Sequence, residues 1–143
     1  MKPYIKKFDG KQTAIVTEAY IFPSFEPGSL PAVKYFTRNA AWDTGSENTI
    51  ISPELAEALE LRPIGHTDVV GIGGSHKVAI YEVAIGLPNG HLYHRYKVLC
   101  DEIIDYEVLF GMDIITETDF LITNEGGKTT FQFRTPSEGG VEL

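Results

Sequence analysis

Cysteine is scarce in this chain, and long apolar stretches are missing altogether. Cys100 is the single cysteine among 143 residues, so no disulfide can form within the chain and a reducing compartment suits it. No stretch approaches the length of a membrane span, and residues 1–7 lack the apolar segment of a secretory signal. We therefore expect a cytoplasmic protein that does not enter a membrane.

Basic residues are also few, with 12 lysines and arginines against 20 aspartates and glutamates and a formal net charge of −8. The field of such a protein repels phosphate backbones and anionic lipid surfaces. We therefore expect neither nucleic acid nor a membrane surface as a partner.

The overall composition is that of an ordinary globular protein, with 43% hydrophobic and 22% charged residues. The length suits one domain with a single core and is too short for two. We expect a single domain over residues 1–135. Residues 136–143, which contain two glycines and two acidic residues, are expected to form a flexible C-terminal tail.

Helical periodicity is rare, whereas short apolar runs interrupted by glycine, proline and asparagine recur, which is typical of an all-β protein. The clearest hairpin joins residues 81–87 to residues 92–100. Asn89 and Gly90 predict a type I′ turn between them, because both tolerate positive φ. Alternation predicts that one face of this hairpin carries Tyr81, Val83, Ile85, Leu87, Leu92, Tyr96, Val98 and Cys100.

A second hairpin is predicted from residues 120–122 to residues 131–133, through a turn at residues 124–127. Residues 14–22 and 32–42 predict two earlier strands, which a loop rich in proline, glycine and serine connects. The chain should therefore contain several short strands and little else.

One longer helix is predicted over residues 53–61. Ser52 can cap its N-terminus, Pro53 suits its first turn, and apolar residues recur at the spacing of one helix face. A shorter helical turn is expected after Gly111.

The most informative motif is Asp43, Thr44 and Gly45 at the end of an apolar strand. A strand end holds a carboxyl group rigidly, and glycine lets a backbone N–H approach and hydrogen-bond it. By chance alone the tripeptide arises in on the order of a few per cent of chains this long. On its own it therefore indicates a catalytic carboxylate and a hairpin-closing turn about equally.

Two more segments strengthen the catalytic interpretation. Gly71, Ile72, Gly73 and Gly74 lie between two apolar strands and place one isoleucine at the expected tip. A flexible hairpin tip is the simple structural interpretation, and a glycine-hinged flap over a bound chain is the functional one. Residues 107–115 contain an apolar strand that ends in glycine, which by itself indicates only a buried strand.

Taken in order, these segments resemble the retropepsin family of aspartic peptidases over about residues 14–133. That family has apolar residues before Asp-Thr-Gly, then a Gly-Ile-Gly-Gly flap, and then two apolar residues with a glycine before a short helix. The corresponding segments here are Ala41-Trp42-Asp43-Thr44-Gly45, Gly71-Ile72-Gly73-Gly74 and Leu109-Phe110-Gly111.

The resemblance implies a closed acid-protease β-barrel with one main helix and a β-hairpin flap. Because the chain has a single Asp-Thr-Gly, it also implies a homodimer in which Asp43 of each protomer meets at the two-fold axis. Two carboxyl groups so close do not both ionise readily, so they share a proton and activate water for peptide-bond hydrolysis. This chemistry needs neither a metal nor a cofactor.

The same resemblance assigns roles to individual residues. Thr44 would hydrogen-bond across the dimer, and Gly45 would contact the aspartate pair through its backbone. The tip formed by residues 71–74 would cover an extended peptide or protein substrate, which adds main-chain hydrogen bonds as a strand does.

Other polar side chains are expected to have structural roles. His91 and His94 are three residues apart on a strand, so they point to opposite faces and cannot bind one metal ion. Cys100 is expected to be a core thiol, since it lies on the apolar face without a histidine partner. Asp113 is expected to cap the short helix.

Two histidines and three acidic residues complete the candidates. His66 and His76 flank the predicted flap and are expected to be solvated or on an edge strand. Glu102, Asp105 and Glu107 are expected to lie in a solvated loop.

Two other functions stay open at this point. A non-catalytic dimeric peptide-binding or scaffolding module would keep the fold without turnover. A monomeric β-barrel binding domain would carry the motif by coincidence. Peptide hydrolysis separates the first from a peptidase, and sedimentation separates the second, because a monomer cannot assemble the aspartate pair.

Overall fold

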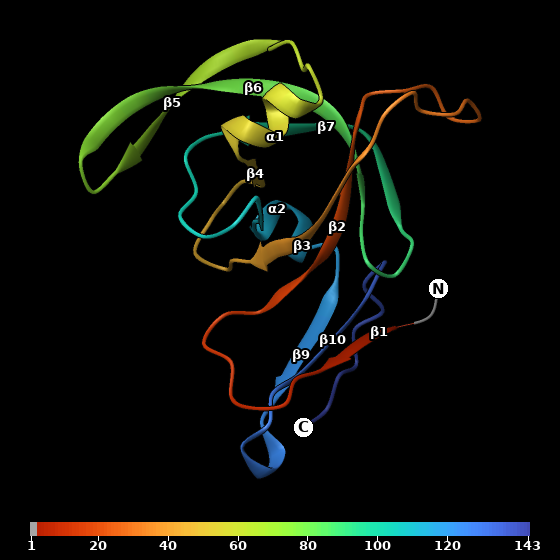
Figure 1. Cartoon of the computed structure of the whole chain (residues 1–143). Coiled ribbons are helices and arrows are strands. Elements are labelled where there is room, and N and C mark those ends of the chain that lie inside the picture. The colour runs from red at the N-terminus through yellow and green to blue at the C-terminus, as the bar shows by residue number, and fades with distance from the viewer. Residues whose placement is uncertain (1–2) are drawn as a thin grey trace.

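Strands make up most of the regular structure in the computed structural model, which describes residues 3–143 (Figure 1). Residues 1 and 2 of the predicted domain lie outside this part. The strands are β1 (Tyr4–Lys7), β2 (Val16–Pro23), β3 (Tyr35–Trp42), β4 (Ile50–Ile51), β5 (Gly65–Gly71), β6 (Gly74–Gly86), β7 (Leu92–Cys100), β8 (Val108–Phe110), β9 (Asp119–Thr123) and β10 (Thr130–Arg134). The helical elements are α1 (Pro53–Ala58), α2 (Met112–Ile115) and the 3-10 turn η1 (Glu125–Gly127). The predicted all-β fold is confirmed.

Six of these strands close into a barrel. Neighbours pair in the order β2, β3, β8, β4, β7 and β6, and β6 pairs again with β2 to complete the ring. The β3–β8 and β4–β7 pairs are parallel, and the other pairs are antiparallel. Because the ring is closed, the backbone groups around it have hydrogen-bond partners. The predicted closed barrel is confirmed. β5 pairs with β6, and the two strands arch away from the barrel as a long hairpin (Figure 1).

The strands β1, β10 and β9 form a separate antiparallel sheet next to the barrel (Figure 1). Phe131 pairs with Ile122 across β9 and β10, and with Lys6 across β10 and β1. The predicted hairpin of residues 120–122 and 131–133 is therefore confirmed, and η1 lies in its turn. The N-terminal strand is held against the C-terminal hairpin of the same chain.

Trp42 joins the barrel to this second sheet. Its side chain is buried, and its ring centroid lies 4.8 Å from that of Phe110 in the barrel. The centroids of Phe131 and Phe133 in the second sheet lie 5.3 and 4.8 Å away. The indole Nε1 donates a hydrogen bond to Thr17 Oγ1 at 3.0 Å, so the buried N–H has a partner. One large aromatic residue thus fixes the relative position of the two sheets just before Asp43.

The strands predicted over residues 14–22 and 32–42 are β2 and β3, which begin later, at Val16 and Tyr35. The loop between them extends to residue 34 and contains Pro31, which has no N–H for a sheet ladder. The earlier starts in the prediction came from apolar residues, Ala14 and Ile15 before β2 and Ala32 and Val33 in this loop.

The helix α1 begins where the sequence predicts it but is shorter than residues 53–61. Ser52 Oγ accepts a hydrogen bond from the Leu55 N–H at 3.2 Å, and Pro53 occupies the first turn. Leu59 has left the helical dihedral region with ψ of 1°, and Glu60 has a φ of 52°, so the chain turns away. The short helix after Gly111 is α2, as predicted. No helix in the described residues has the length and apolarity that crossing a membrane requires.

The predicted hairpin of β6 and β7 forms, but its turn is not type I′. The Gly90 N–H donates to the Leu87 carbonyl at 2.9 Å, so Pro88 and Asn89 are the central residues. Of the Asn89–Gly90 pair only Gly90 has positive φ, at 90°. Pro88 fixes a negative φ at the first central position, which excludes a type I′ turn there. The prediction was wrong because it ignored the proline.

A bulge in β7 also changes which residues share a face. The register with β6 shifts between Tyr93 and Tyr96, where two residues of β7 oppose one of β6. Arg95 lies in this bulge with a φ of 51°. Tyr93 rather than Leu92 therefore shares the face of Tyr96, and their ring centroids are 5.3 Å apart. In β7, the predicted face was correct only for the residues that follow the bulge.

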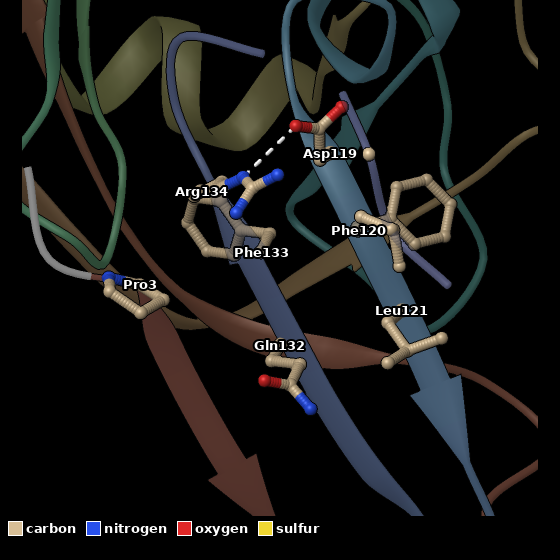
Figure 2. A pocket seen from close by; sticks show the side chains of 9 residues that line it. Pro3, Asp119, Phe120, Leu121, Gln132, Phe133 and Arg134 are labelled. Atoms are coloured by element: carbon tan, nitrogen blue, oxygen red, sulfur yellow. Dashed lines mark hydrogen bonds and ion pairs between the residues drawn. The ribbon is translucent and has the colours of Figure 1, made fainter. Parts of the chain in front are cut away.

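The C-terminal tail begins with an anchor on the second sheet. The Asp119 carboxylate accepts hydrogen bonds from Ser137 Oγ and from the N–H groups of Glu138 and Gly139, at 2.5, 2.7 and 2.9 Å. Figure 2 shows Arg134 reaching the same carboxylate from the neighbouring strand, at 3.0 Å, beside a cavity of about 260 Å³. The flexibility of residues 136–143 stays a prediction, and these bonds restrict it for residues 137–139.

Candidate active site

Asp43 lies directly after β3, at the end of the barrel. Its N–H donates to the Phe110 carbonyl at 2.9 Å, which continues the parallel pairing of Trp42 with Phe110. Its Oδ1 accepts a hydrogen bond from the Gly45 N–H at 2.8 Å, and its side chain is partly exposed. The strand therefore fixes the backbone of Asp43, and the Gly45 N–H holds its carboxylate.

Gly45 leaves just enough room for this arrangement. A Cβ atom at this position would lie 3.1 Å from Asp43 Oδ1, tighter than an ordinary contact. The Ser46 N–H donates to the Asp43 carbonyl at 3.2 Å, which closes a turn over Thr44 and Gly45. The motif is thus both a turn and a carboxylate support, so the two sequence interpretations are compatible.

The segment after β8 supports this loop through backbone hydrogen bonds. The Met112 N–H donates to the Ser46 carbonyl at 2.7 Å, and the Asp113 N–H donates to the Glu47 carbonyl at 3.2 Å. Gly111 passes so close to the loop that a Cβ atom on it would lie 2.4 Å from the Asn48 carbonyl oxygen. A glycine is therefore required at the end of this apolar strand, for a reason that lies in another segment of the chain.

Asp113 is not the N-cap residue of α2, contrary to the prediction, because Gly111 occupies that position. The Asp113 carboxylate accepts from the Ile114 N–H in the first turn at 2.9 Å, and it also accepts from the Thr49 N–H at 3.1 Å and from Thr49 Oγ1 at 2.8 Å. Thr49 Oγ1 also accepts from the Gly111 N–H at 3.3 Å. Thr49 is completely buried, so these bonds satisfy polar groups that have lost water. Thr49 is a support of the site that the sequence did not indicate.

The glycine cluster forms the tip of the β5–β6 hairpin. Gly71 and Gly74 are its last paired residues, and Gly74 has a φ of 104°. Ile72 is fully exposed between them, as the sequence predicted for the tip. A hydrophobic side chain held in water at the end of a projecting hairpin can cover a bound molecule, and movement of this tip stays a prediction.

The structure brings only part of the predicted site together around one cavity. A cavity of about 610 Å³ lies between the loop after Asp43 and the hairpin, with Gly45 and Gly71 in its lining. Ile72, Gly73 and Gly74 lie beyond this lining. Thr44 lines a different, smaller cavity of about 250 Å³ together with Trp42 and Phe131, on the side of the second sheet.

The histidines have separate environments. The His91 ring packs against Tyr93 with centroids 4.6 Å apart, and the His94 ring packs against Phe25 at 5.0 Å. His66 is exposed. His76 is exposed as predicted, but its Nε2 lies 2.9 Å from Asp101 Oδ2, a pairing that the sequence did not indicate.

Cys100 and the acidic segment after it follow the predictions in part. Cys100 packs against the core, and burial together with the nearby Asp101 carboxylate raises the pKa of its thiol, which fits a core thiol. Glu102 and Asp105 are exposed, as expected. Glu107 is not simply solvated, because it accepts a hydrogen bond from the Tyr35 hydroxyl at 2.7 Å.

The chain has a retropepsin-like fold. It is similar to the EIAV protease in complex with the inhibitor HBY-793, at 19% identity and a TM-score of 0.52, over 73% of this chain and 86% of that chain. It is also similar to a retropepsin-like aspartic protease from Rickettsia conorii, at 13% identity and a TM-score of 0.53, over 92% of each chain. No family model and no curated protein matches the sequence. At these identities the likeness establishes the fold, and the chemistry has to be argued from this chain's own residues.

Proposed function

We propose that this chain is one protomer of a homodimeric aspartic endopeptidase and that Asp43 is its catalytic residue. The observation that carries the proposal is the bond from the Gly45 N–H to Asp43 Oδ1, at 2.8 Å, at the end of a barrel strand in a retropepsin-like fold. Both similar structures are named as proteases, and each aligns over most of this chain. The loop that holds Asp43 is braced by α2, so the carboxylate is pre-positioned.

The proposed reaction needs two copies of the chain, because the sequence contains one Asp-Thr-Gly. Two Asp43 carboxyl groups at a two-fold axis would share one proton, since ionising both in proximity is unfavourable. The ionised carboxylate takes a proton from water, which attacks the peptide carbonyl carbon. The protonated partner donates to the carbonyl oxygen, and a proton then passes to the leaving nitrogen.

The remaining predicted residues have supporting roles in this proposal. Thr44 contacts the second protomer beside the aspartate pair, and Gly45 supports the carboxylate through its N–H. The tip at residues 71–74 acts as a flap that covers an extended peptide or protein substrate. Since its single cysteine packs in the core, the cytoplasm is the proposed compartment.

Replacing Asp43 by Asn is the direct test. Asp43→Asn keeps the shape of the side chain and removes the group that takes and gives the proton, so peptide hydrolysis should fall to background. Circular dichroism and sedimentation should be unchanged. Asp9→Asn, at an exposed position remote from the loop, is the control and should keep full activity. Unchanged turnover in Asp43→Asn would refute the proposal, and so would a strictly monomeric protein in the presence of peptide.

The main alternative is a dimeric peptide-binding or scaffolding module on the same fold. It predicts that the protein binds extended peptides without hydrolysing them at any pH from about 3 to 7, the range in which a coupled aspartate pair can hold one proton. Binding measured by calorimetry, alongside product analysis by mass spectrometry on the same peptides, decides between the two functions.

A further inference from the structure

The residues that line the cavity of about 610 Å³, between the loop after Asp43 and the β5–β6 hairpin, indicate what the cavity could bind. Gly45, which lines it, is the residue whose N–H supports the Asp43 carboxylate. Asp43 itself is not in the lining, so a side chain that occupies this cavity would lie beside the loop that holds the proposed catalytic group.

One wall of the cavity is apolar and comes from three strands of the barrel and from the hairpin. Ile50 and Leu99 are paired across β4 and β7, and Val78 of β6 is buried beside them. Val69 of β5 continues this wall onto the hairpin. Such a wall suits the aliphatic part of a long side chain.

Most of the charged residues that line the cavity are acidic. Glu47, Asp68 and Asp101 line it, and no lysine or arginine does. Of these, Asp68 is the cross-strand partner of Lys77, while its neighbour Val69 is partner of His76. Because side chains alternate along a strand, the Asp68 side chain points to the opposite face from Val69, so Asp68 borders the cavity from its side.

His76 is the one basic group in the lining, and it contacts only one of the carboxylates there. Its Nε2 contacts Asp101 Oδ2 at 2.9 Å, while Asp101 Oδ1 accepts from the Glu102 N–H at 2.9 Å. Glu47, on the loop after Asp43, is exposed. The summed charge of the protein, −8 per chain, reinforces the local field.

We propose that this cavity is a substrate subsite for a long basic side chain, lysine or arginine, in the peptide cleaved at Asp43. This inference rests on the proposed function and adds the class of substrate to it. The aliphatic stem lies on the apolar wall, and the charged head lies between Glu47 and Asp101. An acidic side chain is repelled, and an aliphatic one lacks the charge attraction to Glu47 and Asp101.

The test measures binding to the Asp43→Asn protein, which retains the cavity and cannot cleave the probe. The probes are extended octapeptides in which lysine, norleucine or glutamate occupies each position in turn. Norleucine has the same aliphatic stem as lysine without its charge. At about pH 7.5, the lysine peptide should bind about fivefold to tenfold tighter than the norleucine peptide at one position.

Charge removal in the cavity identifies the site of this preference. Glu47→Gln and Asp101→Asn should each lower the ratio of lysine to norleucine affinity, and the double variant should bring it to about one. Glu102→Gln removes the same charge next to Asp101 but outside the lining, so it should leave the ratio unchanged. Thermal melting confirms that each variant is folded.

The outcomes separate this inference from the proposed function. A ratio near one at every position, a preference that survives in the double variant, or no detectable binding overturns the subsite. Hydrolysis of the same peptides by the unaltered protein is measured in parallel. Cleavage without a preference for lysine refutes the subsite alone, whereas a lysine preference without any cleavage refutes the peptidase and leaves the subsite standing.

Discussion

Gly111 lies so close to Asn48 that a Cβ atom on the glycine would stand 2.4 Å from the Asn48 carbonyl oxygen. Gly111→Ala therefore has to push the loop after Asp43 away from α2 and strain the bonds between them. We expect this variant to lose about 2–3 kcal/mol of unfolding free energy, in the range of other overpacked positions. Urea unfolding followed by the fluorescence of the single tryptophan, Trp42, measures the loss.

Gly10→Ala is the matched control for this substitution. A Cβ atom on Gly10 meets no heavy atom within 4 Å, so the change should alter the unfolding free energy by less than about 1 kcal/mol. Equal stability of the two variants would contradict the close contact between Gly111 and the loop. Under the proposed function, peptide hydrolysis should survive in Gly10→Ala and be lost in Gly111→Ala.

Much of the fold could be predicted because its signals are local. Alternating apolar residues locate the β6–β7 and β9–β10 hairpins, and Ser52 with Pro53 locates the start of α1. The apolar strand before Asp43 and the glycine cluster at residues 71–74 also lie where the sequence suggested. These features depend on the backbone preferences of neighbouring residues, which spacing along the chain reveals.

The supports of the site could not be predicted because they join segments far apart in the chain. The bond between Thr49 Oγ1 and Asp113 Oδ1 joins residues 64 positions apart, and no pattern of residue spacing predicts it. The contact of His76 with Asp101 also joins distant positions and could not be predicted from spacing. The bulge at Arg95 is a different failure, since a single inserted residue shifts the alternation without leaving a sequence mark.

The bond from the Trp42 indole to Thr17 Oγ1 gives a second prediction. Thr17 is completely buried, so Thr17→Val leaves the indole N–H without a partner in a place that water does not reach. We expect a loss of about 1–3 kcal/mol of unfolding free energy. Thr13→Val, at an exposed position near the start of the same segment, should change it by less than about 0.5 kcal/mol. A Thr17→Val protein as stable as the parent would show that this bond contributes nothing to stability.

The anchor of the tail on Asp119 gives a third prediction. Hydrogen bonds from Ser137 Oγ and the Glu138 N–H hold the pKa of Asp119 well below its usual range. The anchor is therefore fully formed above the ordinary aspartate range and is lost only as the pH falls toward that lowered pKa. At neutral pH, Asp119→Asn should free residues 137–143.

Carboxypeptidase trimming followed by mass spectrometry measures this release. The assay is done in the Asp43→Asn background, so that any activity of the protein itself does not shorten the tail. Trimming should accelerate at least about fivefold in Asp119→Asn, because proteolysis follows the population of the detached tail. Asp9→Asn is again the control. Equal trimming rates would mean that the tail is already free in the parent protein.

The thiol of Cys100 gives a fourth prediction, on pH. Burial, and then the Asp101 carboxylate, raise the pKa of this thiol, so the folded state favours the neutral form. Its contribution to stability is complete below the ordinary thiol pKa of about 8.5 and declines as the pH rises toward the raised value. At about pH 7.5 an aromatic disulfide reagent should modify the folded protein at least about tenfold more slowly than the urea-unfolded chain.

Substitution of the neighbouring carboxylate tests the electrostatic part of this fourth prediction. Asp101→Asn should accelerate modification of Cys100, because one negative charge that opposes thiolate formation is gone. Glu57→Gln, at an exposed position on α1 that does not affect the thiol, should react as the parent does. If both variants keep the parent rate while the unfolded chain reacts quickly, then burial rather than the Asp101 charge protects Cys100.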